Sequence, residues 1–228
     1  MIEVEHLTRR FRRGAETVTA LDDVSLTLGP GELTVAAGPS GSGKTTLLSI
    51  IAGFERADAG RVRFAEPLPP DAPPESLTWR HLAFVPQGLA LLDELTVAEN
   101  VELPALLDPD AGPGRRTAEL LDGLEIGHLA DRYPSLTSGG EQQRTAIARA
   151  LRLLPPVLLG DEPTGHQDRD RILLVVALLR AHAYAGNVVL ISSHDEAVID
   201  LADRVITLAD GRVVSDDRPG ARPAASAR

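Results

Sequence analysis

The segment that most constrains this chain runs from Gly38 to Thr46 and reads GPSGSGKTT. It follows the mostly apolar run 33–37 and precedes the mostly apolar run 47–52, so it lies where a buried strand turns into a helix. This is the setting of a phosphate-binding loop, in which glycines let successive backbone N–H groups point inward and the helix adds the positive end of its dipole. The segment therefore predicts a strand, a phosphate cradle and a helix in direct succession.

Two side chains in this loop have predicted roles. Lys44 can reach the β- and γ-phosphates of a nucleotide as a point charge, and the hydroxyl of Thr45 is placed to coordinate Mg²⁺. Lys44 is the only lysine of the chain, and arginine, with its larger planar fork, would not fit the same slot. A Gly/Ser-rich turn that matches by chance is the competing interpretation, and the flanking strand and helix disfavour it. The loop residues expected to contact the nucleotide are Gly38, Pro39, Ser40, Gly41, Ser42, Gly43, Lys44, Thr45 and Thr46.

Composition excludes several classes of function. The formal charge of −10 argues against sequence-independent nucleic-acid binding, which needs clustered Lys and Arg. Without cysteine there can be no disulfide, thiolate–zinc site or cysteine nucleophile, which suits a reducing cytoplasm. Residues 1–5 read as a strand rather than a signal peptide, and the apolar runs fall short of the roughly 20 residues that span a bilayer. We therefore expect no direct membrane insertion.

Short strand patterns alternate with helical ones, which favours right-handed βαβ units around a mainly parallel sheet. The apolar runs 157–160 and 187–192 predict buried parallel strands. A helix should join them and bury Ile172, Val175, Val176 and Leu179, which follow a helical period. Further strands are expected at 2–5 as an edge strand, at 24–28, 61–64 and 83–85, and at 205–208 and 213–214 around an Asp210-Gly211 turn.

The chain also divides into segments. Residues 67–74 contain five prolines and should form a surface insert. From Thr96 to about Leu154 the period is helical, which predicts an inserted helical subdomain. We expect residues 1–87 and 155–216 to form a core subdomain, 88–154 the helical subdomain, and 217–228 a disordered tail.

Polar side chains follow three predicted strands at their carboxyl ends, where open α/β sheets bind ligands. Asp161 can hold Mg²⁺ through water, and Glu162 can polarise the water that attacks a γ-phosphate. His194 could donate a hydrogen bond to that phosphate, and Gln87 can offer its amide oxygen to Mg²⁺ and the attacking water. The alternatives are a helix cap for the acidic pair, a structural histidine and an ordinary surface glutamine.

A second anion site is predicted at residues 136–144, LTSGGEQQR. The hydroxyl of Ser138, the backbone of Gly139 and Gly140, and the start of a helix continuing to Leu154 together suit a phosphate. The alternative is that Ser138 only caps this helix. A chain with two phosphate sites needs an explanation.

These segments resemble the ATP-binding cassette (ABC) ATPases, and the resemblance covers about residues 2–214. Phe11 is placed like the aromatic residue that stacks on adenine in that family, although it could instead pack locally at a strand end. The matching motifs are Gly38–Thr45 for Walker A, Gln87 for the Q-loop, Ser138–Gln142 for the signature, Val157–Asp161 for Walker B, Glu162 for the catalytic base, Gly165–Asp168 for the D-loop and His194 for the H-loop.

The resemblance implies a P-loop NTPase of α/β class, an ABC-type ATPase with a mainly parallel core sheet, an antiparallel β edge and the inserted helical subdomain. It implies a head-to-tail homodimer in the ATP-bound state, in which each nucleotide lies between one subunit's phosphate loop and the other's signature. The nucleotide contacts then include Ser138, Gly139, Gly140, Glu141 and Asp168. ATP and Mg²⁺ are the implied cofactors.

The implied function is ATP hydrolysis that drives transport by separate integral-membrane permease subunits, with the chain at the cytoplasmic face of the membrane. Segments 19–26 and 95–104 look like the branch that serves lipoprotein release, macrolide export and cell division. One alternative is an ABC ATPase that transmits force without moving a substrate, as cell-division members do. Another is a soluble ATPase acting on nucleic acid, which the acidic charge disfavours.

Two positions depart from the family pattern. Thr137 stands where leucine usually precedes Ser-Gly-Gly, and Gln167 replaces the leucine before the D-loop aspartate. Both positions are expected near the dimer interface, so they bear on hydrolytic rate and on communication between sites. His166 lies in the same loop and receives no role.

Overall fold

The computed structural model describes residues 1–14, 16–70, 72–108, 110, 112–165 and 167–219. Its strands are β1 (Ile2–Arg13), β2 (Glu16–Leu28), β3 (Leu33–Ala37), β4 (Ala59–Phe64), β5 (Leu82–Val85), β6 (Val157–Asp161), β7 (Val188–Ser192), β8 (Arg204–Ala209) and β9 (Arg212–Asp217). Its helices are α1 (Lys44–Ile51), α2 (Val97–Leu107), α3 (Thr117–Gly123), α4 (Gly139–Leu151), α5 (Arg169–Tyr184) and α6 (Glu196–Ile199), with the 3₁₀ turns η1 (Pro74–Ser76), η3 (Gly127–Leu129) and η4 (Pro134–Leu136).

The larger sheet has the strand order β5-β6-β7-β3-β8-β9. Its first five strands pair in parallel, and β9 returns antiparallel to β8 around the Asp210-Gly211 turn, where both residues have positive φ. The smaller sheet, β2-β1-β4, is antiparallel throughout. The predicted α/β class, with a mainly parallel core sheet and antiparallel β structure beside it, is confirmed.

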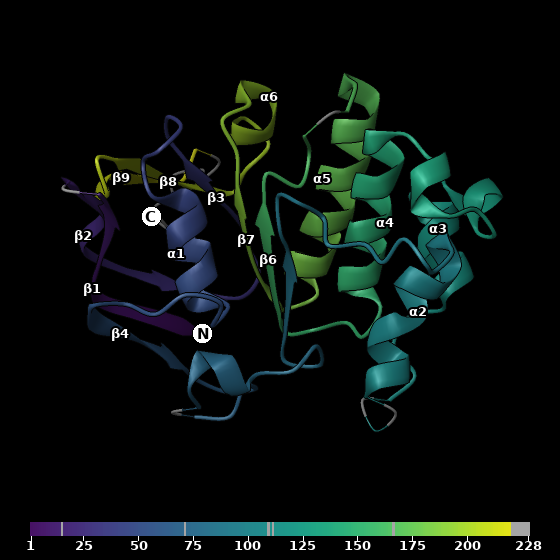
Figure 1. Cartoon of the computed structure of the whole chain (residues 1–228), viewed down its shortest axis with the longest axis horizontal. Coiled ribbons are helices and arrows are strands. Elements are labelled where there is room, and N and C mark those ends of the chain that lie inside the picture. Colours follow the sequence, from purple (N-terminus) through teal and green to yellow (C-terminus); the bar gives the residue numbers. More distant parts are fainter. Residues whose placement is uncertain (15, 71, 109, 111, 166, 220–228) are drawn as a thin grey trace, which may run out of the picture.

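Alternating side chains of the central strands pack into two separate hydrophobic cores. In β3, Leu33 and Val35 point into a cluster with α4 and α5, whereas Ala36 packs with α1 and the smaller sheet. The parallel sheet is therefore buried on both faces, as its continuous apolar strands require. Figure 1 shows α1 between the larger sheet and the β1–β2–β4 layer, with α4 and α5 on the other side of the sheet.

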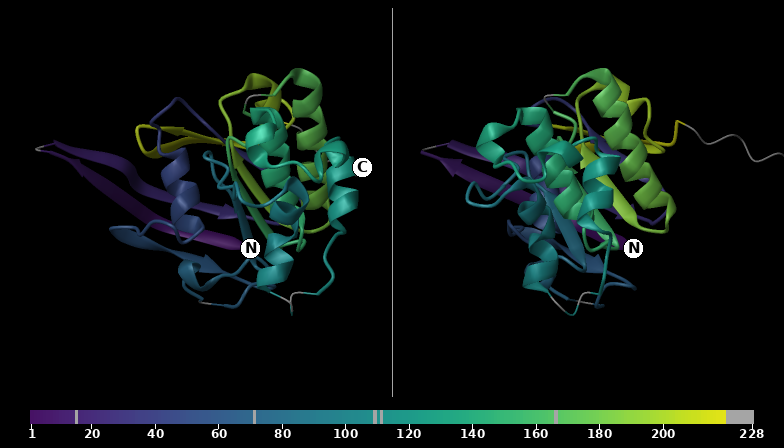
Figure 2. Two further views of the ribbon diagram at one scale, coloured as in Figure 1. Left: turned by 45° about the vertical axis from the view of Figure 1, so that its right-hand side comes forward. Right: turned by 90° about the vertical axis from the view of Figure 1, so that its right-hand side faces the viewer.

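The helical region α2 to α4 packs beside β5 at the right of Figure 1, and Figure 2 shows it from two further sides. The helices α2 and α4 each begin with a capping box, in which Thr96 pairs with Glu99 and Ser138 with Glu141. The crossover helix α5 buries the four predicted apolar residues. Within the described residues, no helix combines the length and apolarity needed to cross a bilayer.

Two expectations were wrong in detail. The strand at 2–5 is not an edge strand, because β1 pairs with β2 on one side and with β4 on the other. An alternating pattern shows that one face of a strand is buried. It does not show whether the strand pairs with another strand on one side or on both. Leu68 lies in the proline-rich insert but is 1% exposed, since it packs into the core.

The segment boundaries are only partly visible in the structure. Asp217, expected to begin the tail, ends strand β9, and residues 220–228 lie outside the described part of the chain. All of α2, α3 and α4 fall inside the predicted helical segment 88–154, and α4 ends at Leu151 rather than Leu154. The division into a core and a helical subdomain stays a prediction.

Candidate functional site

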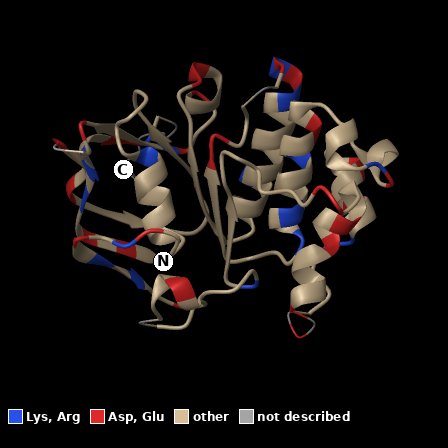
Figure 3. Ribbon diagram, in the orientation of Figure 1, with Lys and Arg blue, Asp and Glu red and all other residues tan. Residues whose placement is uncertain are grey.

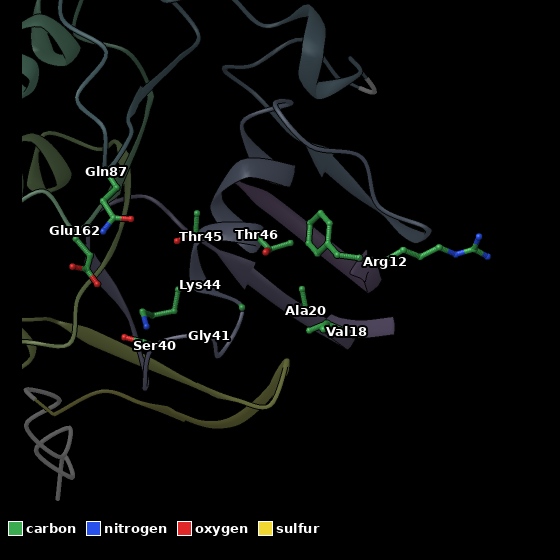
Figure 4. A pocket seen from close by; sticks show the side chains of 12 residues that line it. Arg12, Val18, Ala20, Ser40, Gly41, Lys44, Thr45, Thr46, Gln87 and Glu162 are labelled. Atoms are coloured by element: carbon green, nitrogen blue, oxygen red, sulfur yellow. The ribbon is translucent and has the colours of Figure 1, made fainter. Parts of the chain in front are cut away.

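A cavity of about 720 Å³ opens between the β1–β2 hairpin and the loop before α1. Figure 4 shows Gln87 and Glu162 on one side of Lys44 and Thr45, while Arg12 extends outward on the opposite side. The residues that line the cavity are Phe11, Arg12, Val18, Ala20, Ser40, Gly41, Gly43, Lys44, Thr45, Thr46, Gln87 and Glu162. Segments far apart in the sequence are thus brought to one place.

The backbone of the loop requires glycine at two positions. Gly38 has φ 136° and Gly43, the N-cap residue of α1, has φ 107°, both outside the range that side chains tolerate. A Cβ at Gly38 would overlap the carbonyl oxygen of Leu208, and one at Gly43 would overlap that of Ala20. The loop is therefore packed tightly against β8 and β2. This packing restrains the backbone of the loop and hence the directions of its N–H groups.

The side chain of Lys44 reaches back to the first residues of the loop. Its side chain is largely buried, and its Nζ donates to the carbonyl oxygens of Gly38 at 2.7 Å and Pro39 at 3.0 Å. An ammonium group has three donors, so one remains for a ligand. Because Lys44 also lines the cavity, its charge faces the space above the loop.

A chain of hydrogen bonds ties the loop to the two predicted carboxylates. Thr45 Oγ1 donates to Asp161 Oδ2 at 2.8 Å, and Ser192 Oγ donates to Asp161 Oδ1 at 2.6 Å. The Ser192 oxygen also accepts from the backbone N–H of Glu162 at 2.9 Å. Asp161 and Ser192 are buried and stand opposite each other in the β6–β7 register. The loop and the carboxyl ends of two central strands therefore form one connected unit.

Glu162 stands one residue beyond β6 with φ 50°, a left-handed conformation that a non-glycine residue keeps only when its surroundings hold it. The hydrogen bond to Ser192 supplies one such restraint. His194 Nδ1 lies 2.9 Å from Glu162 Oε1, and the tautomer that carries a hydrogen on Nδ1 donates it to this carboxylate oxygen. The structure thus brings Glu162 and His194 together at the edge of the cavity.

Oxygen ligands that suit Mg²⁺ gather at this end of the cavity. The Thr45 hydroxyl and the Asp161 carboxylate are hydrogen-bonded, and the Gln87 amide lines the same space. In the described part of the chain, no cluster of three or more His, Cys, Asp or Glu side chains could hold a metal alone. Since Mg²⁺ usually takes one or two protein ligands and fills its remaining positions with water and phosphate oxygens, these residues fit it.

Phe11 also lines the cavity. The guanidinium of Arg9 sits 4.6 Å from the centre of its ring, and ion pairs with Glu55 and Asp58 hold that guanidinium in turn. One face of Phe11 is therefore covered by a cation. This arrangement keeps an aromatic surface in the cavity wall, where a planar base could stack.

The residues of the predicted second anion site do not line this cavity. Ser138 caps α4, its backbone N–H donates to Glu141 Oε2 at 2.7 Å, and Gly139 and Gly140 form the first turn. That hydrogen bond holds the pKa of Glu141 below its usual range. Asp168, the remaining predicted contact, caps α5 by accepting from the N–H of Arg171. Within one chain these side chains act as helix caps.

The two departures from the family pattern have partners in the structure. Thr137 Oγ1 donates to the carbonyl oxygen of Pro134 at 2.8 Å. Gln167 Oε1 accepts from Arg144 of α4 at 3.4 Å, so the loop before α5 touches the helix that Ser138 begins. His166 lies outside the described residues.

Sequence reasoning missed Ser192 and Arg149. Ser192 links Asp161 to Glu162 because β6 and β7 are neighbours, and a hydroxyl two positions before His194 was a signal of this link. Arg149 donates to the carbonyl oxygens of Leu89 and Ala90, just beyond Gln87. In the sequence, Arg149 shows only as an arginine between two alanines of a predicted helix, which does not indicate its partner.

Comparisons with known proteins agree with these motifs. The family model described as "ABC transporter" matches residues 21–165. The macrolide export ATP-binding/permease protein MacB 1 of Yersinia pestis bv. Antiqua (strain Antiqua) is 39% identical over 236 aligned positions, which cover 100% of this chain and 36% of that protein. The sulfate/thiosulfate import ATP-binding protein CysA of Nitrosomonas europaea is 41% identical over 220 positions, covering 93% of this chain and 59% of that protein. The chain thus spans less than two thirds of either relative.

Solved structures match along nearly the whole chain. The dimeric structure of MJ0796, a bacterial ABC transporter cassette, is 33% identical and superposes with a TM-score of 0.83, covering 96% of this chain and 98% of that one. A dimeric post-hydrolysis state of the same ATP-binding cassette, bound to ADP and Pi, is 31% identical with a TM-score of 0.84 and the same coverage. Both neighbours match in fold and in sequence.

Proposed function

This chain belongs to the ABC transporter family as an ATP-binding cassette that hydrolyses ATP, and from that premise we propose how its residues act and what it drives. Hydrolysis takes place in the cavity above the Gly38–Thr46 loop. The observation that carries this assignment is the connection from Thr45 through Asp161 and Ser192 to Glu162, which sets phosphate-binding and water-activating groups side by side.

Each side chain has a separate task in the proposed reaction. The free N–H of Lys44 binds a phosphate oxygen, and the loop N–H groups neutralise charge that develops on the γ-phosphate. The Glu162 carboxylate accepts a proton from the attacking water, while His194 orients that carboxylate through its 2.9 Å contact. Mg²⁺ held by Thr45 and Asp161, with Gln87 beside it, would supply further neutralisation of phosphate charge.

We propose that the active form is a head-to-tail homodimer. The Ser138 end of α4 does not line the cavity of its own chain, yet it presents an exposed hydroxyl at a helix N-terminus. A helix N-terminus suits a phosphate supplied by a second chain. The dimeric state of the solved cassette neighbours supports this arrangement.

The chain is proposed to act at the cytoplasmic face of a membrane, on separate integral-membrane subunits. The relatives named above are an exporter and an importer, which favours transport over force transmission without a substrate but leaves the substrate and direction open. Figure 3 shows basic segments interspersed with acidic ones in this view, which together with the net charge of −10 disfavours a nucleic-acid partner.

Replacing Lys44 with alanine should weaken ATP binding at least about tenfold, since a hydrogen bond to a charged group contributes roughly 1.5–3 kcal/mol. The substitution also removes the two contacts that close the loop. Calorimetric titration with ATP·Mg²⁺ measures the effect. Arg56→Ala is the matched control, because it removes an exposed cation outside the cavity. Unchanged affinity in Lys44→Ala would refute the assignment of the cavity.

The membrane subunits are proposed to dock beside Gln87. Phe54 is 74% exposed, and its ring lies 5.5 Å from Phe84 in the strand that leads to Gln87. Exposed aromatic side chains of this kind are enriched in protein interfaces. Docking here would place the partner next to a residue of the ATP site.

Phe54→Ser should therefore reduce the affinity for the membrane subunit about tenfold or more, as removal of an aromatic anchor does. Co-purification of the membrane subunit with the tagged full chain measures this loss, and thermal unfolding shows whether each variant is folded. Val214→Ser, at another exposed apolar position, is the matched control. Equal recovery with both variants would exclude the Phe54 surface.

A further inference from the structure

The part of β1 that carries Phe11 into the cavity wall is supported on one side only. The pairing of β1 with β4 ends at Thr8 and Ala59, so residues 9–13 pair with β2 alone. The register between β1 and β2 also shifts on either side of Arg9. Figure 2 shows this end of the β1–β2 hairpin projecting from the rest of the chain. Because a two-stranded ribbon is marginally stable by itself, side chains at its base are needed to fix the position of Phe11.

Arg9 stands where the ribbon leaves the body of the protein. Residues two positions apart in a strand share a face, so Arg9 lies on the same side of β1 as Phe11. The central carbon of its guanidinium lies 4.6 Å from the centre of the Phe11 ring, within the range of a cation–π contact. Since the guanidinium covers one face of the ring, a base can stack only on the other face.

Two carboxylates from the segment between α1 and β4 hold this guanidinium. Arg9 Nη2 lies 2.9 Å from Glu55 Oε1, and Nη1 donates to Asp58 Oδ1 at 2.7 Å. The second oxygen of Asp58 accepts from the backbone N–H of Arg10 at 2.7 Å. The Arg10 N–H, together with the Arg9 guanidinium, holds the pKa of Asp58 below its usual range, so this carboxylate is charged at neutral pH. The position of Arg9 relative to the body is therefore fixed.

The contacts of Arg9 use the planar shape of its side chain. The side chain is 22% exposed, and among the described residues its buried Nε has no partner. Leaving a buried N–H unsatisfied costs free energy, which a surface ion pair alone would not require. A planar guanidinium can bind two carboxylates through its edge while its flat side covers an aromatic ring, and a compact ammonium group cannot.

We propose that Arg9 is a positioning residue for the nucleotide base, which fixes the Phe11 ring so that its free face is presented to the base. Phe11 lines the cavity and Arg9 does not, so Arg9 acts through the ring. Stacking on an aromatic ring is open to any base, because every base has a π-face. This inference rests on the proposed function, because it concerns how the proposed cavity binds the base of its nucleotide.

The test is a double-mutant cycle between Arg9 and Phe11 in the full chain. Arg9→Ala is made in the wild-type chain and in Phe11→Leu, and calorimetry measures the affinity of each protein for ADP·Mg²⁺, which carries the base but no γ-phosphate. Steady-state assays with ATP give KM and kcat. Arg10→Ala is the matched control, because Arg10 is exposed, does not line the cavity and keeps its backbone N–H in the variant.

Phe11→Leu should weaken ADP binding about 5- to 100-fold, the usual effect of losing an aromatic stacking partner. Arg9→Ala should weaken it about three- to tenfold and raise KM for ATP by a similar factor. It should leave kcat within about twofold, because the phosphate-binding residues are untouched. In the Phe11→Leu background, Arg9→Ala should have little further effect, since the ring through which it acts is gone. Arg9→Lys, which keeps a cation behind the ring, should recover part of the lost affinity.

Three results would overturn the inference. An affinity unchanged in Arg9→Ala would show that Arg9 is only a surface ion pair, and an equal loss in both backgrounds would show that it supports the hairpin without acting through the ring. Wild-type affinity in Phe11→Leu would remove the ring from the site, yet leave hydrolysis above Lys44 standing. Thermal unfolding shows whether each variant is folded, and Arg9→Lys and Glu55→Gln carry the cycle if Arg9→Ala is not. A wild-type chain that binds neither ADP nor ATP would instead refute the proposed function, and this inference with it.

Discussion

Replacing Glu162 with glutamine is expected to lower kcat for ATP by about 10²- to 10⁴-fold, the usual contribution of a general base. The amide keeps the shape of the side chain and its contact distance to His194, but it cannot accept the proton of the attacking water. ATP binding should survive, because Lys44 and the loop N–H groups are untouched. Steady-state ATPase assays and calorimetry measure the two effects separately.

The same variant should accumulate the ATP-bound dimer. At a formal charge of −10, two subunits repel each other, and nucleotide bound between them would offset that repulsion by mass action. Size-exclusion chromatography of Glu162→Gln should show a dimer with ATP·Mg²⁺ and a monomer without it. Glu94→Gln, an exposed glutamate outside the cavity, should hydrolyse ATP normally and serves as the control. A Glu162→Gln protein that stays monomeric in ATP would contradict the shared-site proposal.

Most residues of the cavity could be predicted because they belong to short local motifs of the sequence. Lys44 and Thr45 begin the helix that follows one apolar strand, and Asp161 and Glu162 stand where another apolar strand ends. The ends of parallel strands meet at one edge of a sheet. Local pattern and global topology agree here, so the predicted side chains converge in the structure.

The positions of Ser192 and Arg149 could not be derived in the same way. Ser192 reaches Glu162 across 30 positions, and Arg149 reaches Leu89 across 60. Their roles depend on which strands are neighbours and on how a helix packs against a turn, and neither follows from hydrophobic periodicity. The prediction that residues 2–5 form an edge strand was wrong for the same reason. The second partner of β1 is β4, which lies more than 50 positions away in the sequence.

The local structure at Ser138 permits two interpretations, and a substitution separates them. As a helix cap, Ser138 accepts from Glu141 N at 3.4 Å, a long hydrogen bond. Ser138→Arg should then cost about 1 kcal/mol, which lowers the melting temperature of a chain of this size by about 2–4 °C. If Ser138 also meets the γ-phosphate held by a second chain, the bulky cation should abolish hydrolysis while ATP still binds above Lys44.

Mixing two inactive chains decides between these interpretations. A heterodimer of Ser138→Arg with Lys44→Ala contains one composite site in which both halves are intact, whereas a site built from one chain can gain nothing from mixing. Random pairing makes half of the dimers heterodimers with one competent site of two, so activity should recover to about a quarter of the wild-type value if one site turns over alone. ATPase assays of the mixture measure this recovery, with each variant alone as the control. Heterodimers that form but remain inactive would count against a site shared between chains, or would show that the two sites must act together.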